Sequence, residues 1–149
     1  MKKHLIIFVC HGNICRSPVA AILFNKIAAE KGLVDYHAIS RATSLEEIGN
    51  DIYPPMKMVL DNHDIKYDRH FATRISEDEF LQAEHIYYMD THNLYYLERM
   101  FARNDKYLLI SRFVDDKIIE DPWYTGRFEY VYKRIYECVD KIVDFYLNK

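Results

Sequence analysis

The sequence has 149 residues, about the length of one globular domain, and a chain of this size folds without a structural metal or disulfide. Half of the residues are hydrophobic and 29% are charged, an ordinary globular balance. Lys and Arg total 20 against 23 Asp and Glu, and the net charge of −3 argues against nucleic acid or an anionic membrane as a partner. We therefore expect one domain over residues 1–149.

The first part of the chain alternates strand, helix and strand. The apolar run from Leu5 to Val9 predicts a strand that is buried on both faces. Ser17 and Pro18 predict the start of a helix, with Ser17 as its cap, and Gly32 predicts its end. A second strand is expected at about Tyr36 to Ser40. This order implies a right-handed crossover and a parallel sheet.

The rest of the chain repeats the alternation. The expected elements are a helix over Asp51 to Asn62 that is interrupted early by Pro54 and Pro55, a short helix with a capping box of Ser76 and Glu79, a strand from His85 to Met89, a helix capped by Asp90, a strand from Tyr107 to Ile110, and a last helix from about Arg127 to Leu147. Together they predict an α/β fold, a three-layer sandwich with a four-stranded parallel sheet flanked by helices. Ligands of such sheets bind at the carboxyl ends of the strands.

The cysteines favour a reducing compartment. Cys10, Cys15 and Cys138 are an odd, low number without a repeated spacing, unlike a secreted disulfide framework. The first apolar run is only six residues long, which is shorter than a secretory h-region, and no stretch approaches the ~20 apolar residues of a membrane span. We expect a cytoplasmic protein, with Cys138 a buried apolar residue of the last helix.

The loop after the first strand, CHGNICRS from Cys10 to Ser17, carries the chemistry. Loops between a parallel strand and a helix N-terminus bind anions through their backbone N–H groups. Gly12 and Asn13 tolerate the left-handed backbone angles of a tight cradle, and Arg16 supplies a fork that matches two phosphoryl oxygens. The same donors stabilise a thiolate at Cys10. A phosphate cradle, a thiolate and an arginine together indicate a cysteine-dependent phosphatase.

Taken alone, each of these residues has a plainer interpretation. A Cys at the end of a buried strand is more often a small core residue, and Asp121 before Pro122 favours a turn whatever its function. His70 alone is more often a structural histidine. The combination of a buried strand, Cys, a Gly-Asn turn, Arg and a helix start favours catalysis.

At this point the chain resembles the low-molecular-weight protein tyrosine phosphatases. That family has a Cys-x5-Arg loop near the N-terminus, followed by Ser, and a distant Asp-Pro-aromatic loop that supplies a general acid. Here the second motif is EDPWYTG, which contains Asp121. The resemblance continues through SRATSLEEIGN (Ser40 to Asn50), through His70 followed by Ala72, and through YMDTHN (Tyr88 to Asn93), so it covers essentially the whole chain.

The resemblance implies three catalytic residues. Cys10 attacks phosphorus, Arg16 and the loop amides hold the equatorial oxygens, and Asp121 protonates the leaving phenolate and then activates the hydrolytic water. No metal or cofactor is implied, because Arg16 and the backbone dipoles supply the electrostatic stabilisation. The residues implied to bind substrate are His11, Gly12, Asn13, Ile14, Cys15, Ser17, Glu46, Trp123 and Tyr124. Ser17 is also implied to donate a hydrogen bond to the Cys10 sulfur. The residues implied to hold the loop and orient Arg16 are Asn13, Ser40, His70 and Asp90.

Several positions depart from the pattern of that family. Trp123 stands where Tyr is usual, and Glu46 stands where an aromatic residue often forms the opposite wall of the pocket. Ala21 replaces a carboxylate, and Thr73 stands where the family has an Arg, which is displaced here to Arg74. These changes concern substrate preference rather than the chemistry.

The function predicted is hydrolysis of protein phosphotyrosine and small aryl phosphates through a cysteinyl-phosphate, by a monomer or weak dimer with phosphotyrosine proteins as partners. A deep, narrow pocket is reached by phosphotyrosine and not by the shorter phosphoserine. Three alternatives are an arsenate reductase of the same fold, a cysteine phosphocarrier and an idle phosphotyrosine-binding module. A reductase needs resolving cysteines, and residues 16 to 137 contain none. A phosphocarrier does not require Arg16 together with a distant Asp121. A phosphotyrosine-binding module does not require a nucleophile and a general acid.

Cys15 also predicts redox sensitivity. A loop curled around a phosphate brings its ends together, so Cys10 and Cys15 could meet the Cα spacing that a disulfide requires. Cys10 would be oxidised first, to a sulfenic acid, and Cys15 would then resolve it. The alternative is that Cys15 is merely a small residue packed under the loop.

Overall fold

Strand β1 (His4–Cys10) runs through the middle of the sheet and fixes where the loop after it lies. The computed structural model describes residues 3–149. In it, β1 pairs in parallel with β2 (Tyr36–Ala42) and with β3 (Ala83–Tyr88), and β3 pairs in parallel with β4 (Tyr107–Leu109). The strand order β2-β1-β3-β4 confirms the predicted four-stranded parallel sheet.

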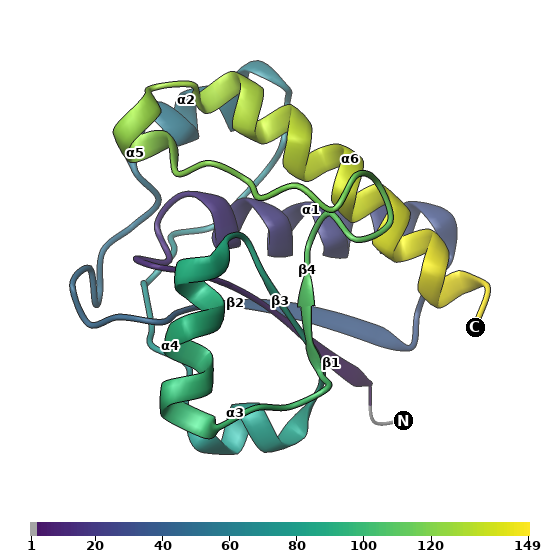
Figure 1. Ribbon diagram of the computed structural model, residues 1–149. Coiled ribbons are helices and arrows are strands. Elements are labelled where there is room, and N and C mark those ends of the chain that lie inside the picture. The colour runs from purple at the N-terminus through teal and green to yellow at the C-terminus, as the bar shows by residue number, and fades with distance from the viewer. Residues whose placement is uncertain (1–2) are drawn as a thin grey trace.

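Helices cover both faces of this sheet, as Figure 1 shows. One face carries α1 (Arg16–Lys31), α2 (Pro54–Asn62) and α6 (Phe128–Leu147), and the other carries α3 (Glu77–Gln82) and α4 (Thr91–Phe101).

Side chains of β1 alternate between the two cores, because successive residues of a strand point to opposite faces. Ile6 and Phe8 belong to the core under α1 and α6, whereas Ile7 and Val9 belong to the core under α3 and α4. Cys10 has the parity of the first set and belongs to the same core, so its side chain lies on the α1 side of the sheet at the carboxyl end of β1.

Several predicted helix ends are confirmed. Gly32 caps α1 in the left-handed conformation, with φ of 79°. Ser76 forms the capping box with Glu79 at α3, and Asp90 forms one with Asn93 at α4. The Asp90 cap places that carboxylate at the carboxyl edge of the sheet, immediately after β3.

Other boundaries differ from the prediction. The cap assigned to Ser17 is wrong: α1 begins at Arg16, and the Ser17 hydroxyl contacts the Cys10 sulfur instead. Pro54 does not interrupt a helix but begins α2, where its missing N–H costs nothing. Strand β2 continues to Ala42 because Ala42 pairs with Cys10. Strands β3 and β4 end one residue early, at Tyr88 and Leu109.

The short helix α5 (Pro122–Thr125) is absent from the sequence prediction. Its four residues give no periodic pattern, yet Asp121 caps it and Pro122 occupies its first turn. Within residues 3–149, no helix combines the length and the apolar character that crossing a membrane requires.

Candidate active site

The loop from Cys10 to Ser17 presents unpaired backbone donors. Among the residues that the structure describes, 3–149, the backbone N–H groups of residues 11–15 donate no hydrogen bond. Asn13 has a φ of 60°, the left-handed conformation that Asn tolerates. The N-terminus of α1 follows directly, and its dipole favours a negative charge there. The loop is therefore built to receive an anion.

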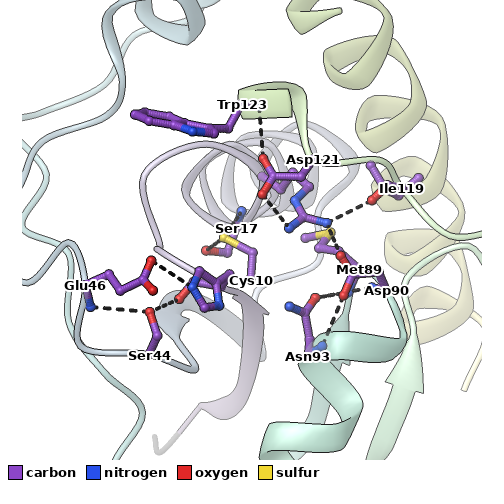
Figure 2. Close-up of polar contacts among 12 residues, drawn as sticks. Cys10, Ser17, Ser44, Glu46, Met89, Asp90, Asn93, Ile119, Asp121 and Trp123 are labelled. Atoms are coloured by element: carbon purple, nitrogen blue, oxygen red, sulfur yellow. Dashed lines mark hydrogen bonds and ion pairs between the residues drawn. The ribbon is translucent and has the colours of Figure 1, made fainter. Parts of the chain in front are cut away.

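The Cys10 sulfur lies at the base of this loop. It is 3% exposed, and two groups of Ser17 approach it: the hydroxyl Oγ at 3.0 Å and the backbone N–H, which donates to Sγ at 3.4 Å (Figure 2). Asn13 Nδ2 donates to Ser17 Oγ at 2.8 Å, which leaves the hydroxyl hydrogen free to point at the sulfur. Two donors aimed at one sulfur stabilise a thiolate, the nucleophilic form of cysteine.

Arg16 is held by groups from two distant segments. Its Nη1 donates to Asp90 Oδ2 at 2.7 Å and to the Ile119 carbonyl at 2.8 Å. The side chain is 2% exposed, and burial opposes its charge, but Cys10, Asp90 and Asp121 together keep the pKa of Arg16 above its ordinary value. A charged guanidinium is thus fixed beside the loop, where it can donate hydrogen bonds to two oxygens of an anion.

Asp121, at the start of α5, lies beside the Arg16 guanidinium. Its Oδ1 accepts a hydrogen bond from the Trp123 N–H at 3.0 Å, which caps α5, and its Oδ2 lies 3.5 Å from Arg16 Nη2. Because the cap occupies one oxygen, the other is free to face the cavity above Cys10. The carboxyl is therefore placed to exchange a proton with a group bound there.

The bend at Asn13 is braced from the segment after α2. His70 Nε2 lies 2.6 Å from the Asn13 carbonyl oxygen, and the Thr73 N–H donates to Asn13 Oδ1 at 3.1 Å. Burial lowers the pKa of His70, so the neutral imidazole is favoured and its Nε2–H donates to the carbonyl. Asp51 in turn accepts from the His70 N–H at 3.0 Å. Burial alone would raise the pKa of Asp51, but hydrogen bonds from Lys57 and from two backbone N–H groups lower it.

These groups surround a cavity of about 130 Å³, hereafter the recess. This volume has room for a phosphoryl group next to Cys10, and the aromatic side chains that also line the cavity are available to the remainder of a substrate. The residues that line it are Cys10, His11, Gly12, Ile14, Cys15, Arg16, Glu46, Glu47, Asp121, Trp123 and Tyr124.

The rim has one aromatic wall. Trp123 is 52% exposed and Tyr124 is 84% exposed, and the Trp123 ring packs on Tyr53 at 4.8 Å between centroids. Tyr53 also donates its backbone N–H to the Ile14 carbonyl at 2.9 Å, so it links α5 to the loop. An exposed aromatic wall next to the recess is suited to a planar ring.

The residues that the sequence singled out line this recess or contact its loop and Arg16, and Ser40 is the exception. Cys10 pairs with Ala42, so Ser40 lies two residues earlier in β2, opposite Phe8. Its side chain makes no hydrogen bond to the loop within the described residues 3–149. The hydroxyl of Ser17 instead approaches the Arg41 carbonyl at 3.4 Å.

Five residues that shape the site are not predicted from the sequence, among them Glu47, which lines the recess. Asp51 and Ser44 hold neighbouring loops, Tyr53 supports the aromatic wall, and Ile119 contributes only its carbonyl to Arg16. A carbonyl contact is independent of residue type, so no pattern could reveal Ile119. The sequence predicts Asp51 inside a helix, whereas it precedes Pro54 and Pro55. An acidic residue just before a helix commonly accepts hydrogen bonds from nearby backbone N–H groups, and this preference could have identified it.

No cluster of three metal-ligating side chains occurs within residues 3–149. Cys138 is fully buried in the core beneath α6, as expected, and burial raises the pKa of its thiol to about 12.

Comparison with known proteins places this arrangement among one family. The sequence profile described as low molecular weight phosphotyrosine protein phosphatase matches residues 5–149. A Bacillus subtilis relative, the low molecular weight protein-tyrosine-phosphatase YfkJ, is 34% identical over 132 residues, which cover 85% of each chain. The rat low molecular weight phosphotyrosine protein phosphatase is 34% identical over 142 residues, 89% of each chain. The crystal structure of YfkJ superposes with a TM-score of 0.92 at 30% identity, over 99% of this chain and 97% of the other.

Proposed function

The chain belongs to the low molecular weight phosphotyrosine protein phosphatase family, and on that premise we propose how its residues carry out the reaction. It is an enzyme that hydrolyses phosphotyrosine in phosphoproteins through a cysteinyl-phosphate intermediate. The observation that carries the residue assignment is the recess itself, where unpaired loop N–H groups, a fixed guanidinium and a facing carboxyl surround one sulfur.

In the first step the Cys10 thiolate attacks phosphorus, forming an S–P bond while the P–O bond to the phenol breaks. Arg16 and the N–H groups of residues 11–15 hold the equatorial oxygens, where negative charge accumulates in the transition state. Protonated Asp121 gives its proton to the leaving oxygen, so the phenol departs neutral and Asp121 becomes a carboxylate.

In the second step Asp121 takes a proton from water, and the water oxygen attacks phosphorus. The S–P bond breaks, inorganic phosphate leaves, and Asp121 is protonated again. Ser17 donates its hydroxyl hydrogen to the departing sulfur, a role supported by the 3.0 Å contact and by the Asn13 bond that orients the hydroxyl. Asn13, His70 and Asp90 act through the loop and Arg16 as positioning residues.

The dimensions of the site support the choice of an aryl ester. Cys10 lies at the base of the recess, 3% exposed, and Trp123 and Tyr124 line the same cavity. A phosphate on a long, flat phenol reaches the sulfur while its ring lies along Trp123 and Tyr124. A phosphate on the short serine side chain would bring the peptide backbone against the rim.

We further propose that residues 1–149 act as one phosphatase domain, as a monomer or weak dimer, in the cytoplasm, without a nucleic-acid or membrane partner. Support for the domain comes from the family match over 5–149. The free thiols Cys10, Cys15 and Cys138 suit a reducing compartment. The net charge of −3 argues against nucleic acid or an anionic membrane as a binding partner.

A substrate panel tests the proposal. Purified protein is given phenyl phosphate, matched phosphotyrosine and phosphoserine peptides, and arsenate with a thiol reductant. We expect release of phosphate from phenyl phosphate and the phosphotyrosine peptide, with phosphoserine turnover lower by at least about 10²-fold, the least that a lost catalytic contact costs. Equal turnover of both peptides would refute the aryl preference, and arsenate reduction without ester hydrolysis would refute the phosphatase assignment.

A further inference from the structure

Glu46 places an exposed negative charge at the rim of the recess. It lines the cavity, its side chain is 69% exposed, and its Oε2 lies 2.9 Å from His11 Nε2. Arg16, the cation that lines the same cavity, is buried beneath the loop with 2% exposure. Within the described residues 3–149, no lysine lines this recess. A substrate therefore meets negative charge as it approaches.

The backbone around Glu46 is tied to the loop, so this side chain extends from a fixed point on the rim. The Ser44 hydroxyl donates to the His11 carbonyl at 2.8 Å, and the Ser44 N–H donates to the same oxygen at 3.2 Å. The Glu46 N–H in turn donates to Ser44 Oγ at 3.4 Å (Figure 2). Three hydrogen bonds thus connect the rim residue to the residue that follows Cys10, and His11 contacts its carboxylate directly.

The neighbouring Glu47 has a different role. Its Cγ packs against Gly12, where an added Cβ would come within 3.1 Å of it, and its Oε2 accepts a hydrogen bond from Asn50 at 2.6 Å. Its carboxylate is thus engaged within its own loop. Glu46 is the more exposed of the two side chains, and its carboxylate contacts His11 at the rim.

The aromatic side chains of the facing wall carry no charge, and the carboxylate next to them, Asp121, is paired with Arg16. It is formed by Trp123 and Tyr124, both exposed aromatic residues of α5. A phosphotyrosine ring that follows this wall leaves the residues next to it in the peptide at the rim, where Glu46 stands. Opposite charges near a protein surface attract one another by a modest amount that salt reduces.

From this geometry we propose that Glu46 makes the enzyme selective for phosphotyrosines flanked by arginine or lysine. The proposal rests on the proposed function and adds a substrate class to it. The carboxylate attracts a basic neighbour and repels an acidic one, and it takes no part in the chemical steps. Glu46 is a specificity-determining residue. Its effect is therefore measured as the ratio of kcat/KM between two substrates.

The experiment compares two phosphotyrosine peptides that differ only in the residues on either side of the phosphotyrosine, arginine in one and glutamate in the other. The ratio of their kcat/KM values is measured for the wild type, Glu46→Gln and Glu46→Lys, and for Glu137→Gln as a matched control. Glu137 is an exposed residue of α6 that lies outside the recess, so its replacement changes the net charge equally. Because the ratio compares two substrates of one protein, the amount of folded enzyme cancels.

We expect the wild type to favour the arginine peptide by roughly fivefold at low salt, as exposed charge pairs allow. Glu46→Gln should lower the ratio by about threefold, Glu46→Lys should bring it to unity or below, and Glu137→Gln should leave it unchanged. Raising the ionic strength to about 0.5 M should shrink the wild-type ratio.

An equal ratio in the wild type and both Glu46 variants, with both peptides hydrolysed, would overturn this inference and leave the proposed function intact. A ratio that falls as much in Glu137→Gln would also overturn it, because net charge would then be the cause. Failure of the wild type to hydrolyse either peptide would refute the proposed function itself.

Discussion

At the carboxyl end of β1 a buried charge lies beside backbone N–H groups that donate no hydrogen bond within residues 3–149, whereas the polar groups packed against the last turn of α6 hydrogen-bond to one another. Four aromatic residues make up this second group, hereafter the tyrosine cluster: Tyr36, His85, Tyr87 and Tyr146. Tyr146 OH lies 2.6 Å from His85 Nδ1 and 2.9 Å from Tyr87 OH, and its ring stacks on Tyr36 at 4.4 Å. Figure 1 places the end of α6 on the side of the molecule away from α5.

The two regions also differ in charge: the tyrosine cluster is neutral, whereas Arg16 at the recess is charged. Burial raises the pKa values of Tyr87 and Tyr146, so the tyrosine cluster stays neutral. Arg16 stays charged in spite of burial, because Cys10, Asp90 and Asp121 surround it. Buried polar groups alone therefore do not mark a site. What distinguishes the recess is spare donor capacity, in the N–H groups of residues 11–15, beside a fixed charge.

The largest effect should come from Cys10→Ser. The substitution changes one atom, so we expect the fold and phosphate binding to persist, while turnover of phenyl phosphate falls by about 10⁴-fold or more, as it does when a nucleophile is lost. Steady-state kinetics and a phosphate-dependent rise in Tm check the two halves of this prediction. Turnover within roughly tenfold of the wild type would contradict nucleophilic catalysis by Cys10.

Asp121→Asn should come second. General acid catalysis contributes about 10²–10⁴ in rate, so kcat/KM on phenyl phosphate, which reports the steps up to departure of the phenol, should fall by that factor. The loss should be much smaller on p-nitrophenyl phosphate, whose acidic phenol leaves without a proton. An equal loss on both esters would mean that Asp121 serves only as the cap of α5.

Cys15 offers a test of how the recess responds to oxidation. Burial, and then the charges of Cys10 and Asp121, raise the pKa of Cys15, so Cys10 rather than Cys15 is the thiol that peroxide oxidises first. Peroxide should inactivate the wild type reversibly, with a Cys10–Cys15 disulfide seen by mass spectrometry. Cys15→Ser should lose activity irreversibly as Cys10 proceeds to sulfinic acid. Equally complete recovery of both proteins with a thiol reductant would show that Cys15 protects nothing.

In the tyrosine cluster, Tyr146→Phe should alter stability and leave catalysis alone. The change removes one hydroxyl and leaves His85 and Tyr87 without their partner, which costs about 1–3 kcal/mol. Urea unfolding should show this loss, with kcat/KM unchanged. Tyr136→Phe is the matched control, because its ring is exposed on α6 and surface changes stay within about 0.5 kcal/mol. A loss of activity in Tyr146→Phe would mean that the two regions are coupled.

The smallest expected effect is on the pH dependence of stability. It involves one histidine from each region, His70 near the recess and His85 in the tyrosine cluster. Burial lowers the pKa values of His70 and His85 in the folded protein. The unfolded chain then binds more protons between the lowered value and the ordinary value near 6.5, so stability is present above that value and decreases as the pH falls through this window.

Replacing either histidine by Gln should flatten this part of the stability curve, measured by urea unfolding between pH 7 and 5. His85→Gln should leave kcat/KM at pH 7 unchanged, whereas His70→Gln should lower it, because His70 holds the Asn13 carbonyl. Identical activity of the two variants would remove His70 from the positioning residues.

The sequence predicted most of what lies close along the chain. The buried strand, the loop with its Cys, Asn and Arg, and the caps at Asp90 and Ser76 all follow from local preferences. Ser17 was misplaced because its residue type suits a helix cap equally well, and only the folded loop brings its hydroxyl to the Cys10 sulfur.

The contacts that depend on tertiary structure could not be predicted. The Ile119 carbonyl that holds Arg16 has no sequence signature, and Ser40 was assigned to the loop although the register of β2 places it opposite Phe8. The tyrosine cluster was missed for the same reason, since Tyr36, His85 and Tyr146 come from three separate elements.

The central claim, that Cys10 carries the phosphoryl group during turnover, is tested most directly by trapping the intermediate. Asp121→Asn is mixed with p-nitrophenyl phosphate, because this ester needs no acid for the first step while the second step lacks its base, and the reaction is quenched in acid within its first turnover. Peptide mass spectrometry should then find one phosphoryl group on Cys10, together with a burst of p-nitrophenol equal to the enzyme present. Turnover without a phosphorylated Cys10 peptide, or with the phosphoryl group on another residue, would contradict the account.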